Sequence, residues 1–288
     1  MNRASVNLLT MLLLVIVLAV TLVLNLPDAA VLETYMQAAL VYGVLTTFTL
    51  YFGVLLSEGE LSPTHTIGMV ALLTQPPAAQ PVMIWAIFVG SVIGGVLLVI
   101  RREDNLLHRP LTVRTTRSVV AISARVTLSF LVAGQFYTAL GGVLPLASLR
   151  QAAQFPLLLF SLMYTAVYLA IFLLEAYTDG HALPRLLRAN VVELLAILLL
   201  PVPFGVVSVV LIAQAPPALL MFVVGTGAFT LGLYSLSRAQ HQVRKQLDES
   251  RLLAVVSQSL QGERDLDALL HTIYEQTARL LHIHHFVV

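Results

Sequence analysis

Long apolar stretches without a charged residue recur along this chain and restrict what it can fold into. Val82–Ile100, for example, is 19 residues long and contains no Asp, Glu, Lys or Arg. A helix needs about 20 mostly apolar residues to cross the hydrocarbon core of a bilayer. Charged residues make up 11% of the chain and its mean hydropathy is +0.88, whereas a soluble domain has about 25% charged residues. The sequence therefore predicts an integral membrane protein and excludes a soluble enzyme.

Eight apolar stretches are expected to form transmembrane helices. They are Val6–Leu26, Ala38–Leu56, Thr66–Leu73, Val82–Ile100, Val119–Leu140, Ala152–Leu174, Val191–Ala213 and Ala218–Leu236. The third is too short to cross alone, so it either uses its flanking residues or re-enters the membrane from one side. Pro201 and Pro203 fall in the middle of the seventh stretch and predict a helix kink there, because proline removes a backbone donor.

The placement of Arg and Lys predicts the orientation of these spans. Basic residues gather in three regions: between the fourth and fifth spans, between the sixth and seventh, and after the eighth. They are Arg101, Arg102, Arg109, Arg114, Arg117, Arg185, Arg188, Arg238, Arg244 and Lys245. These regions share one side of the membrane, and loops rich in Lys and Arg stay cytoplasmic. We therefore expect a multi-pass protein of the plasma membrane with both termini in the cytoplasm.

Net charge and cysteine content exclude further classes. The net charge of +1 gives no drive toward nucleic acid, and a chain without cysteine has no thiolate chemistry or disulfides. No arrangement of catalytic residues, phosphate loop or cofactor motif is present, so neither an active site nor a cofactor is expected. His284 and His285 are neighbours and would point to opposite faces of a strand. With His282 they are interpreted as the edge of a domain rather than as metal ligands.

Four polar residues of the spans are expected at similar depth near the cytoplasmic face: His65, Arg125, Glu175 and Glu193. Charged residues inside a membrane are costly and usually pair with one another. Arg125 is predicted to pair with Glu175 or Glu193. Three roles remain open for this cluster: a pair that fixes helix positions, which is favoured, a latch that breaks during signalling, and a proton or ion route.

Aromatic and amide side chains gather toward the outer half of the spans. They are Trp85, Gln135, Tyr137, Gln154, Tyr164 and Tyr168. Tyr and Trp commonly mark membrane–water interfaces, and this is the favoured interpretation. The alternative is a pocket for a small apolar or aromatic ligand between the fifth and sixth spans.

Composition changes abruptly after Leu236, where a polar stretch without Gly or Pro continues the last span. Residues 237–261 are predicted to form a cytoplasmic signalling helix that resembles a weak coiled coil. Its apolar seam changes phase along the way and consists of Leu236, Val243, Leu247, Leu253, Val256 and Leu260. A single helix cannot bury such a seam, so a parallel homodimer is expected.

The last part of the chain resembles the opening of a GAF domain. The resemblance rests on Ser250–Leu260, Asp265–Leu270, Ile273 and Ala278–Leu281, followed by the strand-like start His284–Val288. It implies that residues 262–288 begin a GAF-like domain that is cut short. Glu58–Pro63 with Gly68–Leu73 is similar to multi-span bacterial sensor regions. Such regions precede GAF domains in two-component histidine kinases and cyclic-di-GMP enzymes.

The expected fold class is an all-α integral membrane protein with about eight transmembrane helices, a cytoplasmic coiled-coil-like helix and a truncated α/β, GAF-like start. Its expected domains are a sensor at 1–236, the signalling helix at 237–261 and the GAF-like start. The predicted function is a sensor and dimerisation module that relays a membrane stimulus to an output domain. The resemblance implies a histidine kinase first and a cyclic-di-GMP enzyme second. The rival prediction is a transporter or channel. Lipid and a second copy of the chain are the expected partners.

Overall fold

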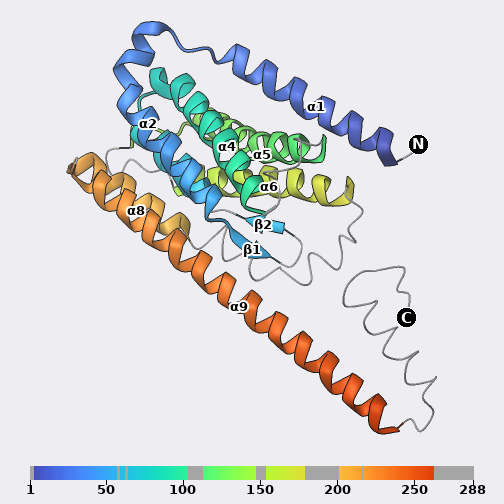
Figure 1. Ribbon diagram of the computed structural model, residues 1–288. Helices are drawn as coiled ribbons and strands as arrows, with labels where there is room; N and C mark the ends of the chain where they lie inside the picture. Colours follow the sequence, from blue (N-terminus) through green and yellow to red (C-terminus); the bar gives the residue numbers. More distant parts are fainter. Residues whose placement is uncertain are drawn as a thin grey trace. The chain divides into compact units, whose positions relative to one another are not determined.

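The computed structural model of the protein describes residues 3–56, 59–61, 64–102, 113–146, 154–178, 201–215 and 217–262. It divides into two units, Met1–Tyr234 and Ser235–Val288, which are described separately. The helices are α1 Arg3–Leu24, α2 Ala29–Tyr51, α3 Thr64–Thr74, α4 Gln80–Arg102, α5 Val113–Ala139, α6 Gln154–Thr178, α8 Pro201–Gln214 and α9 Ala218–Gly262, with a 3-10 turn η1 at Pro77–Ala79 (Figure 1). Two three-residue strands, β1 Val54–Leu56 and β2 Gly59–Leu61, pair antiparallel between α2 and α3.

Five helices of the described residues are long and apolar enough to cross a membrane. They are Ala29–Tyr51, Pro77–Arg101, Thr116–Ala139, Phe155–Tyr177 and Ala218–Gln240. The expectation of eight spans is therefore wrong. Shorter apolar segments of this part are Leu9–Leu24 within α1, Thr64–Thr74 and Pro203–Gln214 within α8. Hydropathy counts apolar residues but does not show where a helix ends. At about 1.5 Å per residue the 11-residue α3 spans roughly 16 Å, about half of a bilayer core.

The expected α/β, GAF-like start is a second correction to the fold class. Within the described residues every element is helical except β1 and β2, which lie in the first unit at 54–61. No α/β domain start is visible there, and α9 runs as helix up to Gly262. Residues 263–288, on which most of the resemblance rested, lie outside the described part. Residues 250–260, the described part of the GAF-like resemblance, thus belong to one long helix.

Helices α2 and α4 pack in parallel through glycines (Figure 1). A Cβ built on Gly90 would lie 2.4 Å from the carbonyl oxygen of Gly43, and one on Gly94 would lie 2.9 Å from the Cβ of Leu50. The Thr47 hydroxyl donates to the carbonyls of Gly43 and Gly90, each at 3.0 Å. Small residues let membrane helices approach closely. Gly43, Gly90 and Gly94 therefore let α2 and α4 pack closely.

The short helix α3 lies in the interior of the bundle. Its residues from Thr64 to Leu73 are buried, and it contacts α2, α4, α5, α6 and α8. Its far end is held by two hydrogen bonds: the Leu146 amide donates to the Leu73 carbonyl at 2.8 Å, and the Tyr42 hydroxyl lies 2.8 Å from Thr74 Oγ1. Helix α3 is thus surrounded by protein and lies at the centre of the first unit.

Candidate functional site

Arg125 is a cation buried inside the helix bundle. It lies on α5 with 4% of its surface exposed, and its Nη1 is 3.7 Å from Oε2 of Glu175 on α6. Its guanidinium also lies over two rings of α6, 4.8 Å from the centre of Tyr168 and 5.3 Å from that of Phe172. This is one of the two pairs that the sequence predicted. A carboxylate and two aromatic faces together offset the cost of placing the charge in the membrane.

A series of ring contacts connects His65 to Arg125. It lies in the first turn of α3, and its ring centre is 5.8 Å from that of Tyr164. Tyr164 stacks on Tyr168 at 6.2 Å, and Tyr168 contacts Arg125. The structure thus connects the three described residues of the expected polar cluster along α6. The fourth, Glu193, lies outside the described residues.

Buried hydroxyl groups make the interior of α3, α5 and α6 polar. Within the described part of the chain, the side-chain oxygens of Thr66, Ser123, Thr127 and Tyr168 are buried and have no hydrogen-bond partner. The interior of the first unit therefore contains polar groups among its apolar side chains.

The tyrosines interpreted as interface markers, or alternatively as the lining of a pocket, are packed as core residues. Tyr137, Tyr164 and Tyr168 are buried, and Phe160 lies between the first two with ring distances of 6.4 and 6.2 Å. The Tyr137 hydroxyl donates to the Val143 carbonyl at 3.0 Å. The other three residues of this group are not placed beside the tyrosines by the structure. Gln135 is exposed, and the side chain of Gln154 lies outside the described part. Trp85 lies on α4, in a groove that it lines together with residues of α2.

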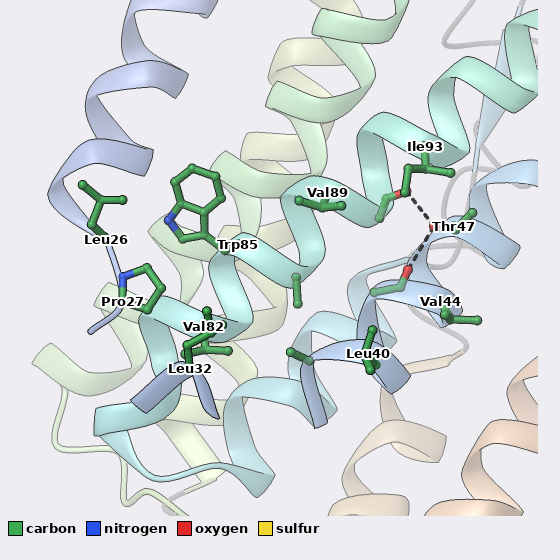
Figure 2. A pocket seen from close by; sticks show the side chains of 14 residues that line it. Leu26, Pro27, Leu32, Leu40, Val44, Thr47, Val82, Trp85, Val89 and Ile93 are labelled. Carbon is green, nitrogen blue, oxygen red and sulfur yellow. Dashed lines mark hydrogen bonds between the residues drawn. The ribbon is translucent and has the colours of Figure 1, made fainter. Parts of the chain in front are cut away.

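Trp85 lines an apolar groove of about 540 Å³ along α2 and α4 (Figure 2). Leu32, Leu40 and Val44 of α2 form one wall, and Val82, Val89 and Ile93 of α4 form the other. The indole Nε1 of Trp85 donates to the Asn25 carbonyl at 3.0 Å, which ties α4 to the end of α1. Sequence reasoning missed this groove because its walls come from two separate stretches. The glycines that bring those stretches together were the available signal.

Arg101 connects the end of α4 to two other helices. Its guanidinium lies 5.3 Å from the ring of Tyr51 on α2 and 5.1 Å from that of Tyr234 on α9, and it donates to the Tyr51 carbonyl. Phe52 also meets Tyr234 edge-on at 5.4 Å. The sequence marked Arg101 only as a basic residue of a cytoplasmic loop. Its role in holding α9 depends on Tyr234, which hydropathy does not distinguish from other span residues.

The predicted seam residues all lie on α9. In the single chain the side chains of Leu236, Val243 and Leu247 are more than half exposed, and those of Leu253, Val256 and Leu260 lie outside the described part. Pro201 and Pro203, where a helix kink is expected, are among the first described residues of α8, so a kink in the preceding stretch stays a prediction. Residues 179–200 lie outside the described part.

Comparison of the chain with protein-family models, with curated proteins and with solved structures finds no match.

Proposed function

We propose that this chain is a membrane-embedded sensor and dimerisation module that relays a change in the bundle through α9. The observation that carries this proposal is the length of α9, which runs for 45 residues without a break. At about 1.5 Å per residue it measures roughly 68 Å, more than twice the ~30 Å hydrocarbon core. Its first part, Ala218–Gln240, has the composition of a span, whereas the rest is polar. Such a helix is a mechanical link between membrane and water.

Contacts at the end of the α9 span support a relay. Tyr234 touches Arg101 of α4 and Phe52, the residue that ends α2. Helices α2 and α4 are locked together by Gly43 and Gly90, so a shift of this pair would act on α9 at Tyr234. We infer that rotation or sliding of the pair is the movement that α9 transmits.

Exposed leucines on α9 support the dimer. Leu236 and Leu247 are 58% and 53% exposed in the single chain, and Val243 lies between them at 54%. A second α9 would cover these side chains. Both copies would leave the membrane on the same side, so the two helices would run parallel. The proposal places the polar end of α9 in the cytoplasm, as the basic residues after Leu236 predict, and leaves the class of the output, a kinase or another enzyme, as a prediction.

The relay can be tested by disulfide crosslinking in native membranes, because the chain has no cysteine of its own. Val243→Cys and Leu247→Cys should each crosslink, at different rates, in the otherwise unchanged protein. Adding Arg101→Ala removes the contact to Tyr234 and should change the ratio of the two rates by threefold or more. Arg238→Ala, an exposed arginine of α9, is the matched control and should leave the ratio unchanged.

A break in α9 provides the second arm of this test. Ala239→Pro should abolish the effect of Arg101→Ala on the ratio, because proline interrupts a helix at a cost of about 3 kcal/mol. If Arg101→Ala leaves the ratio as it was, the bundle does not act on α9 and the relay is rejected.

A transporter or channel is the second candidate, and the polar interior favours it. The Arg125–Glu175 pair and the hydroxyls of Ser123 and Thr127 place polar groups among spanning helices. Intramembrane ionisable residues often mark ion or substrate routes. Proton or ion flux into vesicles containing the purified protein, lost in Arg125→Ala but kept in Arg238→Ala, would favour this candidate over the sensor.

A further inference from the structure

We propose that the groove along α2 and α4 binds one acyl chain of a bilayer lipid. Both walls belong to helices with the length and composition of membrane spans, so the groove opens toward hydrocarbon. The residues at its edges, Leu40 and Val44, are 60% and 65% exposed. Binding of this kind is separate from signalling and does not depend on the relay proposed above.

The chemistry of the lining selects an apolar ligand. Two polar side chains of the described lining, Thr47 and Trp85, already use their donors within the protein. The Thr47 hydroxyl bonds to the carbonyls of Gly43 and Gly90, and the indole of Trp85 bonds to the carbonyl of Asn25. Figure 2 shows the two Thr47 bonds as dashed lines between Ile93 and Val44. A headgroup, an ion or a hydrogen-bonding solute would find no free side-chain donor among these lining residues.

The length of the groove matches one acyl chain. From Val82 to Ile93 it follows α4 for about 17 Å at 1.5 Å per residue, which is roughly half of the ~30 Å core and so one leaflet.

The position of Trp85 identifies the end from which the chain enters. Trp85 lies near Leu26 and Pro27, the residues that link α1 to α2 (Figure 2). Tryptophan favours the membrane interface, where headgroups meet acyl chains. The lipid headgroup would lie at this end, with its chain running past Val89 toward Ile93.

Trp85 is the single tryptophan of the chain, so its fluorescence reports on this groove alone. The experiment titrates delipidated full-length protein in dodecyl maltoside micelles with phosphatidylcholine that carries bromine, a contact quencher, in the middle of its acyl chains. We expect quenching that saturates at one or two lipids per protein. Val89→Phe and Val44→Phe fill the groove from either wall and should raise the half-saturating lipid concentration at least fivefold.

Val224→Phe is the matched control, because Val224 is 62% exposed on α9 and lies outside the groove lining. It should leave the titration unchanged. Size-exclusion chromatography and thermal melts of every variant establish that each is folded. Three results would overturn the proposal: quenching that rises without saturation, equal titrations in the groove variants and the control, or quenching by brominated fatty acid but not by brominated phospholipid. If brominated lipid quenches Trp85 only under conditions that dissociate a dimer, the groove is occupied by a second copy of the chain and not by lipid.

Discussion

At the scale of single residues, the first unit stabilises the buried cation of Arg125 through two kinds of neighbour, a carboxylate and aromatic rings. Arg125 has a carboxylate at 3.7 Å and two ring faces, whereas Glu175 is partly exposed. Removing one partner of a buried pair is more damaging than removing both, because the other charge stays behind uncompensated. The pair therefore fixes α5 against α6 even if its net contribution to stability is small.

Arg125→Ala should destabilise the folded protein by about 3 kcal/mol, because it removes a buried guanidinium that lies 3.7 Å from Glu175 and opens space beside Tyr168. Glu175→Gln should cost less. The double variant should lose less than the sum of the two, with a coupling of at least ~0.5 kcal/mol. Denaturant unfolding in micelles measures all three. Arg238→Ala should change stability by no more than about 0.5 kcal/mol, and strict additivity would show that the two residues do not interact.

Depth along a helix narrowed the expected partner of Arg125 to Glu175 or Glu193, because a count of residues from the span ends puts both at a similar level. The same count could not show which direction a side chain faces. Trp85 was therefore grouped with Tyr164 and Tyr168, although it faces α2. Tyr234 was not singled out at all, since its function depends on Arg101 of another helix.

At the scale of elements, the α2–α4 pair is the most closely packed contact described here. Gly43 and Gly90 meet backbone to backbone, and the hydroxyl of Thr47 bridges both carbonyls. In a membrane, where apolar burial gives little preference for helix over lipid, such close approach supplies the packing energy. The pair is thus a rigid body on which the groove and the contact with Tyr234 both depend.

Gly90→Ala should destabilise the protein by about 2 kcal/mol, because its new Cβ would lie 2.4 Å from a backbone oxygen that cannot move aside cheaply. Gly232→Ala is the control: a Cβ there meets nothing within 4 Å in the described structure, and alanine favours helix by up to ~1 kcal/mol. Thermal melts in micelles should therefore shift down for the first variant and not for the second. Equal melting temperatures would show that the α2–α4 contact is looser than described.

Cysteines placed singly along 236–260 of α9 should crosslink between two copies with a period of three to four residues. The reason is that Leu236, Val243 and Leu247 are more than half exposed in the single chain, and a partner helix that covers them removes apolar surface from water. Crosslinked dimer on gels, after mild oxidation of native membranes, measures this. Crosslinking that is uniform or absent would contradict a parallel dimer and favour a monomeric transporter.

At the scale of the whole molecule, the membrane class was predictable and the number of spans was not. Scarce charge identified a membrane protein, and four of the expected stretches coincide closely with helices of spanning length: α4, α5, α6 and the first part of α9. The helix predicted at Ala38–Leu56 begins earlier, at Ala29 just after Pro27, and ends at Tyr51 before the hairpin. The helix at Thr66–Leu73 is buried by neighbouring helices. Hydropathy cannot show this, because an apolar helix can be surrounded either by protein or by lipid.

Reporter fusions should detect the orientation that the basic residues predict. A fusion after Gln240 should behave as cytoplasmic, because Arg101 and Arg238 both lie near that side of their spans. Fusions near Pro145 or Ala215, in the links after α5 and α8, should behave as external. Paired alkaline phosphatase and fluorescent protein fusions give opposite signals on the two sides. The reverse pattern would invert the topology, and the same signal at all three sites would reject it.

The burial of α3 has a consequence for how the protein is made. An 11-residue helix of roughly 16 Å cannot be released sideways into lipid as a stable span. It also carries Thr64, His65 and Thr66, which hydrocarbon would not accept alone. We therefore expect the order of assembly to differ from the order of synthesis. Helices α2 and α4 insert and pair first, and α3 between them in sequence is drawn in afterwards, so that a delay in synthesising α4 leaves the nascent chain exposed to quality-control proteases.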